Sequence, residues 1–177
     1  MKRIILMVLY NLPFVPYWWW QLCRMAKHPE RYTQEERWKV LQKIVRHANK
    51  GGRVKIESYG TENIPQEENF IFFPNHQGMF DVLALVESCS RFFAVVNKKE
   101  VENVPLLKQV FAITGSLSID REDIRQSMGV INRAAEAVRS GVNFLIFPEG
   151  TRSRQGNRTQ EFKGGSFKSA YKAKCPV

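Results

Sequence analysis

From residue 53 onward the sequence alternates between short apolar runs and helical stretches, and this alternation restricts the possible folds more than any other feature. Five runs rich in β-branched and aromatic residues predict strands at 54–59, 70–74, 92–96, 117–119 and 142–147. Amphipathic patterns between them predict helices at 81–90 and 124–140. Alternating strands and helices fold into a sheet that helices cover on both faces. The sequence therefore predicts an α/β domain with a mixed or largely parallel sheet flanked by helices.

The amino terminus is the most apolar part of the chain. Residues 4–22 contain no charged side chain, and a helix that crosses a bilayer needs about 20 apolar residues. However, Asn11, Pro13 and Pro16 interrupt this run, and Tyr17 is followed by three tryptophans, a pattern typical of a membrane interface. The sequence favours an interfacial or re-entrant anchor over a single membrane span, and a span over a helix packed in the core.

A further helix is predicted between Thr33 and the glycine pair at 51 and 52. Thr33 and Glu36 have the spacing of a capping box, and two consecutive glycines end a helical pattern. Apolar and basic residues fall on opposite faces of this helix, with Trp38, Leu41, Ile44, Val45 and Ala48 on one and Lys39, Lys43, Arg46 and Lys50 on the other. The basic face is either solvated or meets anionic head groups. We expect residues 1–50 to form membrane-associated helices that precede the α/β domain at 51–177.

Positive charge is concentrated at the two ends of the chain. Residues 1–60 carry 12 Lys and Arg against 4 Glu, residues 61–149 carry 8 against 12 Asp and Glu, and residues 150–177 carry 7 against 1. Such an excess fits nucleic acid, anionic lipid or phosphorylated substrates. Because the first basic block lies beside the apolar terminus, we expect a lipid surface and no nucleic acid. The three scattered cysteines fit neither a disulfide framework nor a zinc site, and they indicate a reducing compartment.

A histidine and an aspartate follow the predicted strand at 70–74. In an open α/β sheet the carboxyl ends of the strands line the ligand crevice, so both residues are expected there. His76 and Asp81 can meet only if the chain turns between them, which Gly78 would allow. A carboxylate on one ring nitrogen fixes the tautomer and leaves the other nitrogen as a base. No serine or cysteine nucleophile and no metal-binding motif accompanies the pair, so a substrate hydroxyl would be the nucleophile. The alternative is a histidine that is merely hydrogen-bonded in a turn.

Three sequence blocks, in the same order as in the glycerolipid acyltransferase family, resemble the motifs of that family. Residues 75–81 (NHQGMFD) resemble its HxxxxD motif, and residues 147–153 (FPEGTRS) resemble its FPEGTRS motif. Residues 115–121 (GSLSIDR) resemble its GxxFIDR-like block, with Ser118 in place of an aromatic residue. The stretch that begins at Lys98 resembles the lysine-bearing segment before that block. The family usually carries Ser where this chain has Gly78.

The resemblance implies acyl transfer from a thioester of acyl carrier protein or coenzyme A to the free hydroxyl of lysophosphatidate (1-acylglycerol 3-phosphate). The product would be phosphatidate, made in phospholipid biosynthesis at the cytoplasmic face of a membrane. The resemblance also implies catalysis by His76 and Asp81, with no metal and no cofactor besides the acyl donor. It places acceptor binding at Glu149, Gly150, Thr151, Arg152, Arg121 and Lys98.

Several of these residues have expected roles that chemistry explains. Arg121 and Arg152 offer planar guanidinium groups that suit a phosphate. Glu149 would order Arg152 or contact an acceptor hydroxyl. The tetrahedral oxyanion needs hydrogen-bond donors, for which backbone N–H groups near Gly78 or Gly150 are candidates.

Two other functions stay open. The chain could be an acyltransferase of the same family that uses glycerol 3-phosphate or another lysolipid, or it could be a catalytically inactive basic module that binds membranes. Family members continue past the FPEGTRS block to an apolar strand that contains proline, and residues 173–177 (AKCPV) look like its opening. We therefore expect the sequence to be truncated, with the C-terminal part of the catalytic domain missing.

Overall fold

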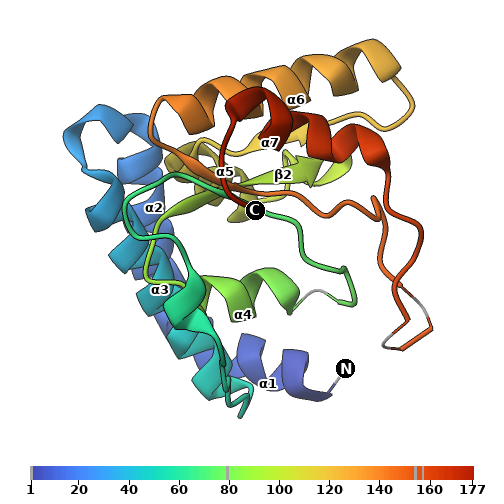
Figure 1. Cartoon of the computed structure of the whole chain (residues 1–177). Coiled ribbons are helices and arrows are strands. Elements are labelled where there is room, and N and C mark those ends of the chain that lie inside the picture. Colours follow the sequence, from blue (N-terminus) through green and yellow to red (C-terminus); the bar gives the residue numbers. More distant parts are fainter. Residues whose placement is uncertain (1, 79, 154, 157) are drawn as a thin grey trace.

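Four short strands form one sheet in which every neighbouring pair is parallel. The computed structural model describes residues 2–78, 80–153, 155–156 and 158–177 (Figure 1). The strands are β1 (Ile71–Phe72), β2 (Phe93–Lys98), β3 (Leu117–Ile119) and β4 (Asn143–Leu145), in the spatial order β1-β4-β2-β3. Phe144 of β4 pairs with Ile71 on one side and with Ala94 on the other. Because all strands are parallel, the segments after them reach the same edge of the sheet.

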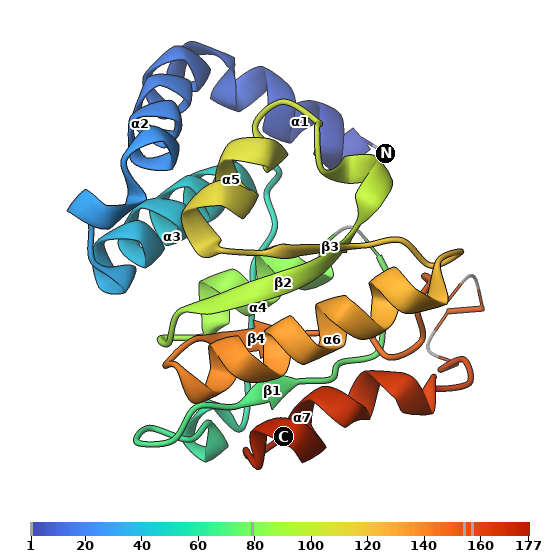
Figure 2. The same ribbon diagram turned by 90° about the horizontal axis from the view of Figure 1, so that it is seen from above.

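Helices cover both faces of this sheet, as predicted from the alternating pattern. One face carries α6 (Ile124–Arg139) and α7 (Lys168–Ala173), which lie side by side in Figure 2. The other face carries α3 (Gln34–Gly51), α4 (Asp81–Ser88) and α5 (Leu107–Thr114). Short 3-10 turns connect these elements at Leu12–Phe14, Pro29–Arg31, Thr61–Asn63, Lys99–Val101 and Gly164–Phe167.

The chain around β1 and β4 is packed on both faces, as its continuous apolar sequence predicts, although β1 is an edge strand of the sheet and not a central one. Phe70, Ile71, Phe144 and Leu145 each expose at most 1% of their surface. Phe70 and Leu145 pack toward α3 and α4, whereas Ile71 and Phe144 pack toward α6 and α7. This packing on both faces positions the chain segments that follow β1 and β4.

Two expectations about secondary structure are corrected. Residues 54–59 form no strand, because they pair with no other strand among the described residues. Tyr59 at the end of this segment is 88% exposed. The sequence analysis also missed α5, at residues 107–114. The remaining strands and helices occur at the predicted places, with ends that differ by a few residues.

The capping box predicted at Thr33 begins α3. The Thr33 N–H donates to Glu36 Oε2 at 2.8 Å, and the Glu36 N–H donates to Thr33 Oγ1 at 3.2 Å. At the other end, Gly51 and Gly52 do more than stop the helix. A Cβ on Gly51 would lie 2.6 Å from Tyr10 Cδ1, and one on Gly52 would lie 2.6 Å from Met7 Cγ. The glycine pair therefore lets the first helix approach α3 closely.

The apolar amino terminus is a pair of helices, α1 (Lys2–Asn11) and α2 (Val15–Lys27), joined by a 3-10 turn. Pro13 and Pro16 lie in the first positions of this turn and of α2, where proline costs no helical hydrogen bond. Much of the apolar surface of the pair faces outward, including Ile5, Val8, Leu9, Leu12 and Trp20, each more than 55% exposed. Across the described residues, every helix is too short or too polar to span a bilayer.

Candidate active site

His76 and Asp81 form a hydrogen-bonded pair at the carboxyl end of the sheet. His76 Nδ1 lies 2.7 Å from Asp81 Oδ2, and both side chains are about four-fifths buried, with 18% and 20% of their surface exposed. A carboxylate only accepts hydrogen bonds, so Nδ1 carries the proton and Nε2 has a free lone pair. The His76 ring also stacks on Phe147, with centroids 4.0 Å apart. The predicted meeting of His76 and Asp81 is confirmed.

The turn between the two residues is held by Asp81 itself. Asp81 is the first residue of α4, and its carboxylate also accepts the backbone N–H groups of Gln77 at 2.8 Å and of Gly78 at 3.0 Å. Gly78 does not adopt a positive φ. The predicted turn is therefore present, and hydrogen bonds to the carboxylate hold it without the backbone conformation that only glycine adopts easily.

The two backbone groups considered for an oxyanion site already have partners. The Gly78 N–H donates to Asp81, and the Gly150 N–H donates to the carbonyl oxygen of Phe147 at 3.1 Å. Neither of these two groups is available to an oxyanion in this conformation, and the expectation of other donors near the two glycines stays a prediction.

Glu149 joins the loop that carries His76 to the loop that follows β4. Its Oε1 accepts the His76 N–H at 2.7 Å, and its Oε2 accepts the Gln160 N–H at 2.9 Å. The residue is only 3% exposed. Both Glu149 and Arg152 are described, and no ion pair joins them, so the structure does not bear out the alternative that Glu149 orders Arg152; contact of Glu149 with an acceptor hydroxyl stays a prediction. Glu149 instead fixes the backbone of the catalytic histidine candidate.

The segment after β4 folds back on itself through further hydrogen bonds. The Ser153 N–H donates to the carbonyl oxygen of His76 at 2.7 Å, and Ser153 Oγ donates to that of Arg158 at 2.6 Å. The Lys163 N–H donates to the carbonyl oxygen of Pro148 at 2.9 Å. The bonds to Arg158 and Lys163 hold residues 158–163 next to the start of the loop. The bond from Ser153 connects the loop to the backbone of His76.

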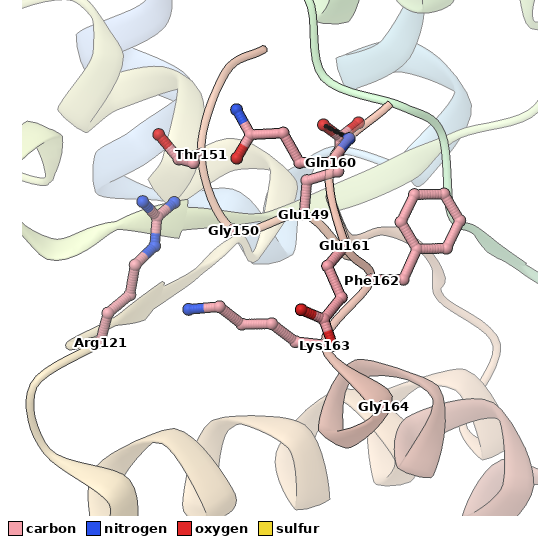
Figure 3. A pocket seen from close by; sticks show the side chains of 9 residues that line it. All are labelled: Arg121, Glu149, Gly150, Thr151, Gln160, Glu161, Phe162, Lys163 and Gly164. Atoms are coloured by element: carbon pink, nitrogen blue, oxygen red, sulfur yellow. Dashed lines mark hydrogen bonds between the residues drawn. The ribbon is translucent and has the colours of Figure 1, made fainter. Parts of the chain in front are cut away.

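A polar cavity of about 570 Å³ opens beside this loop. Figure 3 shows the residues that line it: Arg121, Glu149, Gly150, Thr151, Gln160, Glu161, Phe162, Lys163 and Gly164. Arg121 is largely exposed, but neighbouring atoms remove part of its water, and this burial lowers the pKa of its guanidinium. A partly desolvated cation gains from an anionic ligand. Four of the six predicted acceptor-binding residues line this cavity: Arg121, Glu149, Gly150 and Thr151.

The other two predicted acceptor-binding residues lie outside it. Arg152 is exposed; its carbonyl oxygen accepts a hydrogen bond from Gln160 Nε2 at 3.1 Å. Lys98 forms an ion pair with Glu100, and this contact lowers the pKa of Glu100. The structure does not bring these two cations to the cavity, so their roles in acceptor binding stay predictions.

Sequence reasoning missed Lys163, which contributes the second cation of the cavity. A lysine in a turn-rich loop is usually a solvated surface residue, so its position alone gave no reason to select it. The available signal was the glycine pair at 164 and 165, which marks a tight turn directly after Lys163. Among the described residues, no three His, Cys, Asp or Glu side chains cluster as metal ligands would.

Comparisons with known proteins identify the family of this chain. Residues 55–177 match the family described as Acyltransferase. The 1-acyl-sn-glycerol-3-phosphate acyltransferase of Borreliella burgdorferi is 34% identical over 119 residues, which cover 67% of this chain and 47% of that protein. The enzyme of the same name from Escherichia coli is 32% identical over 122 residues, which cover 68% of this chain and 46% of that protein. The chain thus spans about half the length of these curated relatives.

A solved structure has the same fold. The crystal structure of the 1-acyl-sn-glycerophosphate (LPA) acyltransferase PlsC from Thermotoga maritima superposes with a TM-score of 0.78 at 24% identity. The match covers 100% of this chain and 73% of that chain. The family match extends over the whole α/β part of the chain, including the His76–Asp81 pair and the loop after β4. This chain belongs to the acyltransferase family.

Proposed function

We propose that this protein transfers a fatty acyl group from an acyl thioester to the free hydroxyl of 1-acylglycerol 3-phosphate and so forms phosphatidate. The observation that carries the proposal is the 2.7 Å contact between His76 Nδ1 and Asp81 Oδ2, next to a cavity that contains Arg121. The pair supplies a base, and the cavity supplies a cation for an acidic acceptor. Relatives that are named as 1-acyl-sn-glycerol-3-phosphate acyltransferases support the choice of acceptor.

The reaction follows from the free lone pair on His76 Nε2. That nitrogen takes the proton of the acceptor hydroxyl while the hydroxyl oxygen attacks the thioester carbonyl carbon. Asp81 stabilises the imidazolium that forms, and such positioned base catalysis is worth about 10²–10⁴-fold. When the tetrahedral intermediate collapses, the C–S bond breaks and the thiolate receives the proton from His76. The products are the acyl ester and the free thiol of the carrier.

The phosphate of the acceptor would bind in the cavity at the carboxyl end of the sheet. Arg121 lies there, and the Glu149 carboxylate beside it is held by two backbone N–H groups. An acceptor phosphate at Arg121 would lie in the cavity that Glu149 lines, and Glu149 accepts the N–H of His76. The acyl donor is a thioester of acyl carrier protein or of coenzyme A, and no cofactor is needed for this chemistry.

Membrane attachment through α1 and α2 would bring the lipid acceptor to the site. Both helices expose apolar side chains, and α1 lies on the opposite side of the sheet from α6 and α7 (Figure 1). A pair of short helices with exposed apolar and tryptophan side chains suits an interfacial anchor. The free thiols of Cys23, Cys89 and Cys175 support the cytoplasmic face, where thiols stay reduced.

The membrane proposal is tested by vesicle binding. Leu9 and Leu12 are 62% and 60% exposed. The double substitution of both leucines by serine should weaken binding to anionic vesicles roughly tenfold or more, because each leucine contributes about 1–2 kcal/mol when it leaves water. Tyr171→Ser on α7 is the control, because Tyr171 is 86% exposed on the other side of the sheet. Equal effects of the two changes would contradict attachment through α1.

The catalytic proposal is tested by release of free thiol from acyl carrier protein and coenzyme A donors, with a panel of acceptors. The panel contains 1-acylglycerol 3-phosphate, glycerol 3-phosphate and a lysophospholipid with a larger head group. Thiol release should depend on the first acceptor and should be lost in His76→Ala while the fold, measured by circular dichroism, is kept. Turnover in folded His76→Ala would contradict the mechanism. Vesicle binding without thiol release from any donor would favour an inactive membrane-binding module.

A further inference from the structure

Three residues lie at a junction between two cavities. The polar cavity beside Glu149 adjoins a second cavity of about 380 Å³ on the α6 side of the sheet, with apolar side chains such as Val96, Ile131 and Ile146 in its wall. Arg121, Gly150 and Lys163 line both cavities. In Figure 3, Arg121 reaches in from the loop after β3, and Lys163 reaches in from the segment before Gly164. Two cations from distant parts of the sequence therefore extend into one space.

The loop after β4 holds Lys163 at this place. The Lys163 N–H donates to the carbonyl oxygen of Pro148 at 2.9 Å, and three residues earlier the Gln160 N–H donates to Glu149 Oε2 at 2.9 Å. The same Glu149 carboxylate accepts the His76 N–H at 2.7 Å. The backbone of Lys163 is thus tied to the loop that carries His76, although 87 positions separate the two residues in the sequence.

The absence of a side chain at Gly150 makes room for the Lys163 ammonium. Gly150 has a φ of +69°, and a Cβ there would lie 3.1 Å from Lys163 Cε and 3.2 Å from Lys163 Nζ. The lysine therefore extends across the bare backbone of Gly150, next to residues of the FPEGTRS motif. Lys163 is an exposed residue, and the missing side chain at Gly150 leaves room for its side chain at this place.

The charges around Lys163 leave it available to an anion. Both carboxylate oxygens of Glu149 accept backbone N–H groups. Glu161 lies at the exposed rim of the cavity and forms no ion pair with Lys163, although the structure describes both residues. By contrast, the nearby Lys98 and Lys99 pair with Glu100 and Asp120. Within the described part of the chain, Lys163 has no carboxylate within 4.0 Å.

We infer that Lys163 is a ligand of the acceptor phosphate and binds it together with Arg121 across Gly150. This inference rests on the proposed function and assigns a residue that the sequence motifs do not include. A phosphate monoester carries close to two negative charges at neutral pH, so one guanidinium and one ammonium match it. The specificity for a phosphorylated acceptor thus depends on Lys163, while the chemical step depends on His76 and Asp81.

The test compares Lys163→Gln, Lys163→Arg and Lys168→Gln. Lys168 is the matched control, because it is also exposed and lines only the second cavity. Lys163→Gln should lower kcat/KM for 1-acylglycerol 3-phosphate by roughly 10- to 100-fold, as the loss of a charged hydrogen bond predicts. The KM for the acyl donor should stay within about twofold, and Lys163→Arg should restore most of the activity, since it keeps the charge.

A binding measurement separates this inference from the proposed function. Equilibrium binding of 1-acylglycerol 3-phosphate and of monoacylglycerol, which lacks the phosphate, is measured in micelles with His76→Ala alone and with His76→Ala combined with Lys163→Gln. The added change should weaken only the phosphorylated ligand. If acyl transfer is absent but this binding difference persists, the proposed function fails and the inference holds. Equal effects on both ligands, unchanged binding, or an equal loss in Lys168→Gln would overturn the inference.

Discussion

The carboxylate of Glu149 accepts the backbone N–H of His76 at 2.7 Å, and this bond connects two segments that the sequence separates by 73 residues. The other oxygen of Glu149 accepts the Gln160 N–H at 2.9 Å. One buried side chain thus sets the position of the candidate base and the position of the loop that bears Lys163. Base and acceptor site are held in a fixed relation by a residue that need not contact the reacting atoms.

Glu149→Gln should therefore damage both stability and turnover. A glutamine offers one acceptor oxygen and one amide nitrogen, so one of the two backbone N–H groups loses its partner. An unpaired buried donor costs about 1–3 kcal/mol, which corresponds to a fall in Tm of roughly 2–10 °C for a chain of this length. Calorimetry and thiol release measure the two effects. Wild-type Tm and turnover in Glu149→Gln would contradict the bridging role.

Gly78→Ser should be tolerated, although Gly78 lies between the two catalytic candidates. A Cβ at this position would lie 3.8 Å from Asp81 Oδ1, an ordinary contact, and the backbone there does not require glycine. Substitutions without strain change energies by about 0.5 kcal/mol, so thiol release should stay within about threefold of the wild type. A loss of 100-fold or more would mean that the turn cannot hold a side chain.

Arg121→Ala should impair use of the acceptor more than Arg152→Ala does. Arg121 lines the cavity, whereas the exposed Arg152 does not. Each change should raise the KM for 1-acylglycerol 3-phosphate and leave the KM for the donor unchanged, and lysine should be a poor replacement because it lacks the planar fork. Steady-state kinetics of Arg121→Ala, Arg121→Lys, Arg152→Ala and Arg152→Lys show which arginine contributes more to acceptor binding. A larger effect at Arg152 would place the phosphate on the outer side of the loop.

The parts of the site that were predictable from the sequence are local. His76 and Asp81 are five positions apart, so a short turn is enough to bring them together. The burial of β1 and β4 follows from their apolar runs. The role of Glu149 was not predictable, because its partners are backbone N–H groups in two loops that only the fold brings together. Lys163 was missed for the same reason.

The errors in the fold have a similar origin. Residues 54–59 have the composition of a strand, but a strand also needs a neighbour, and the composition of one segment cannot supply it. The sequence analysis assigned no element to residues 107–114, although they fold as α5 with Ile113 and Thr114 buried. The prolines at 13 and 16 were read as interruptions of one helix, whereas they begin new helical turns.

Gly150→Ala should weaken acceptor binding through Lys163. An alanine at a φ of +69° is strained by about 1–2 kcal/mol, and its Cβ would displace the lysine side chain. Gly156→Ala is the matched control, because Gly156 has a φ of +62° and a Cβ there would meet none of the described atoms within 4 Å. Both variants should lose similar stability, measured as Tm, but only Gly150→Ala should raise the KM for the acceptor. Equal KM values in the two variants would contradict the contact between Gly150 and Lys163.

Gly51→Ala should loosen α1 from the end of α3. A Cβ at Gly51 would lie 2.6 Å from Cδ1 and 2.8 Å from Cβ of Tyr10, so the first helix must move. Overpacking of this kind costs about 1–3 kcal/mol. The control is Gly129→Ala in α6, where a Cβ would meet no atom of the described part of the chain within 4 Å and a helical alanine stabilises by up to about 1 kcal/mol. Gly51→Ala should lower both Tm and vesicle binding, and Gly129→Ala should lower neither. If Gly51→Ala keeps full vesicle binding while its Tm falls, the tight contact with α3 serves stability alone, and attachment to membranes does not depend on where α1 is held.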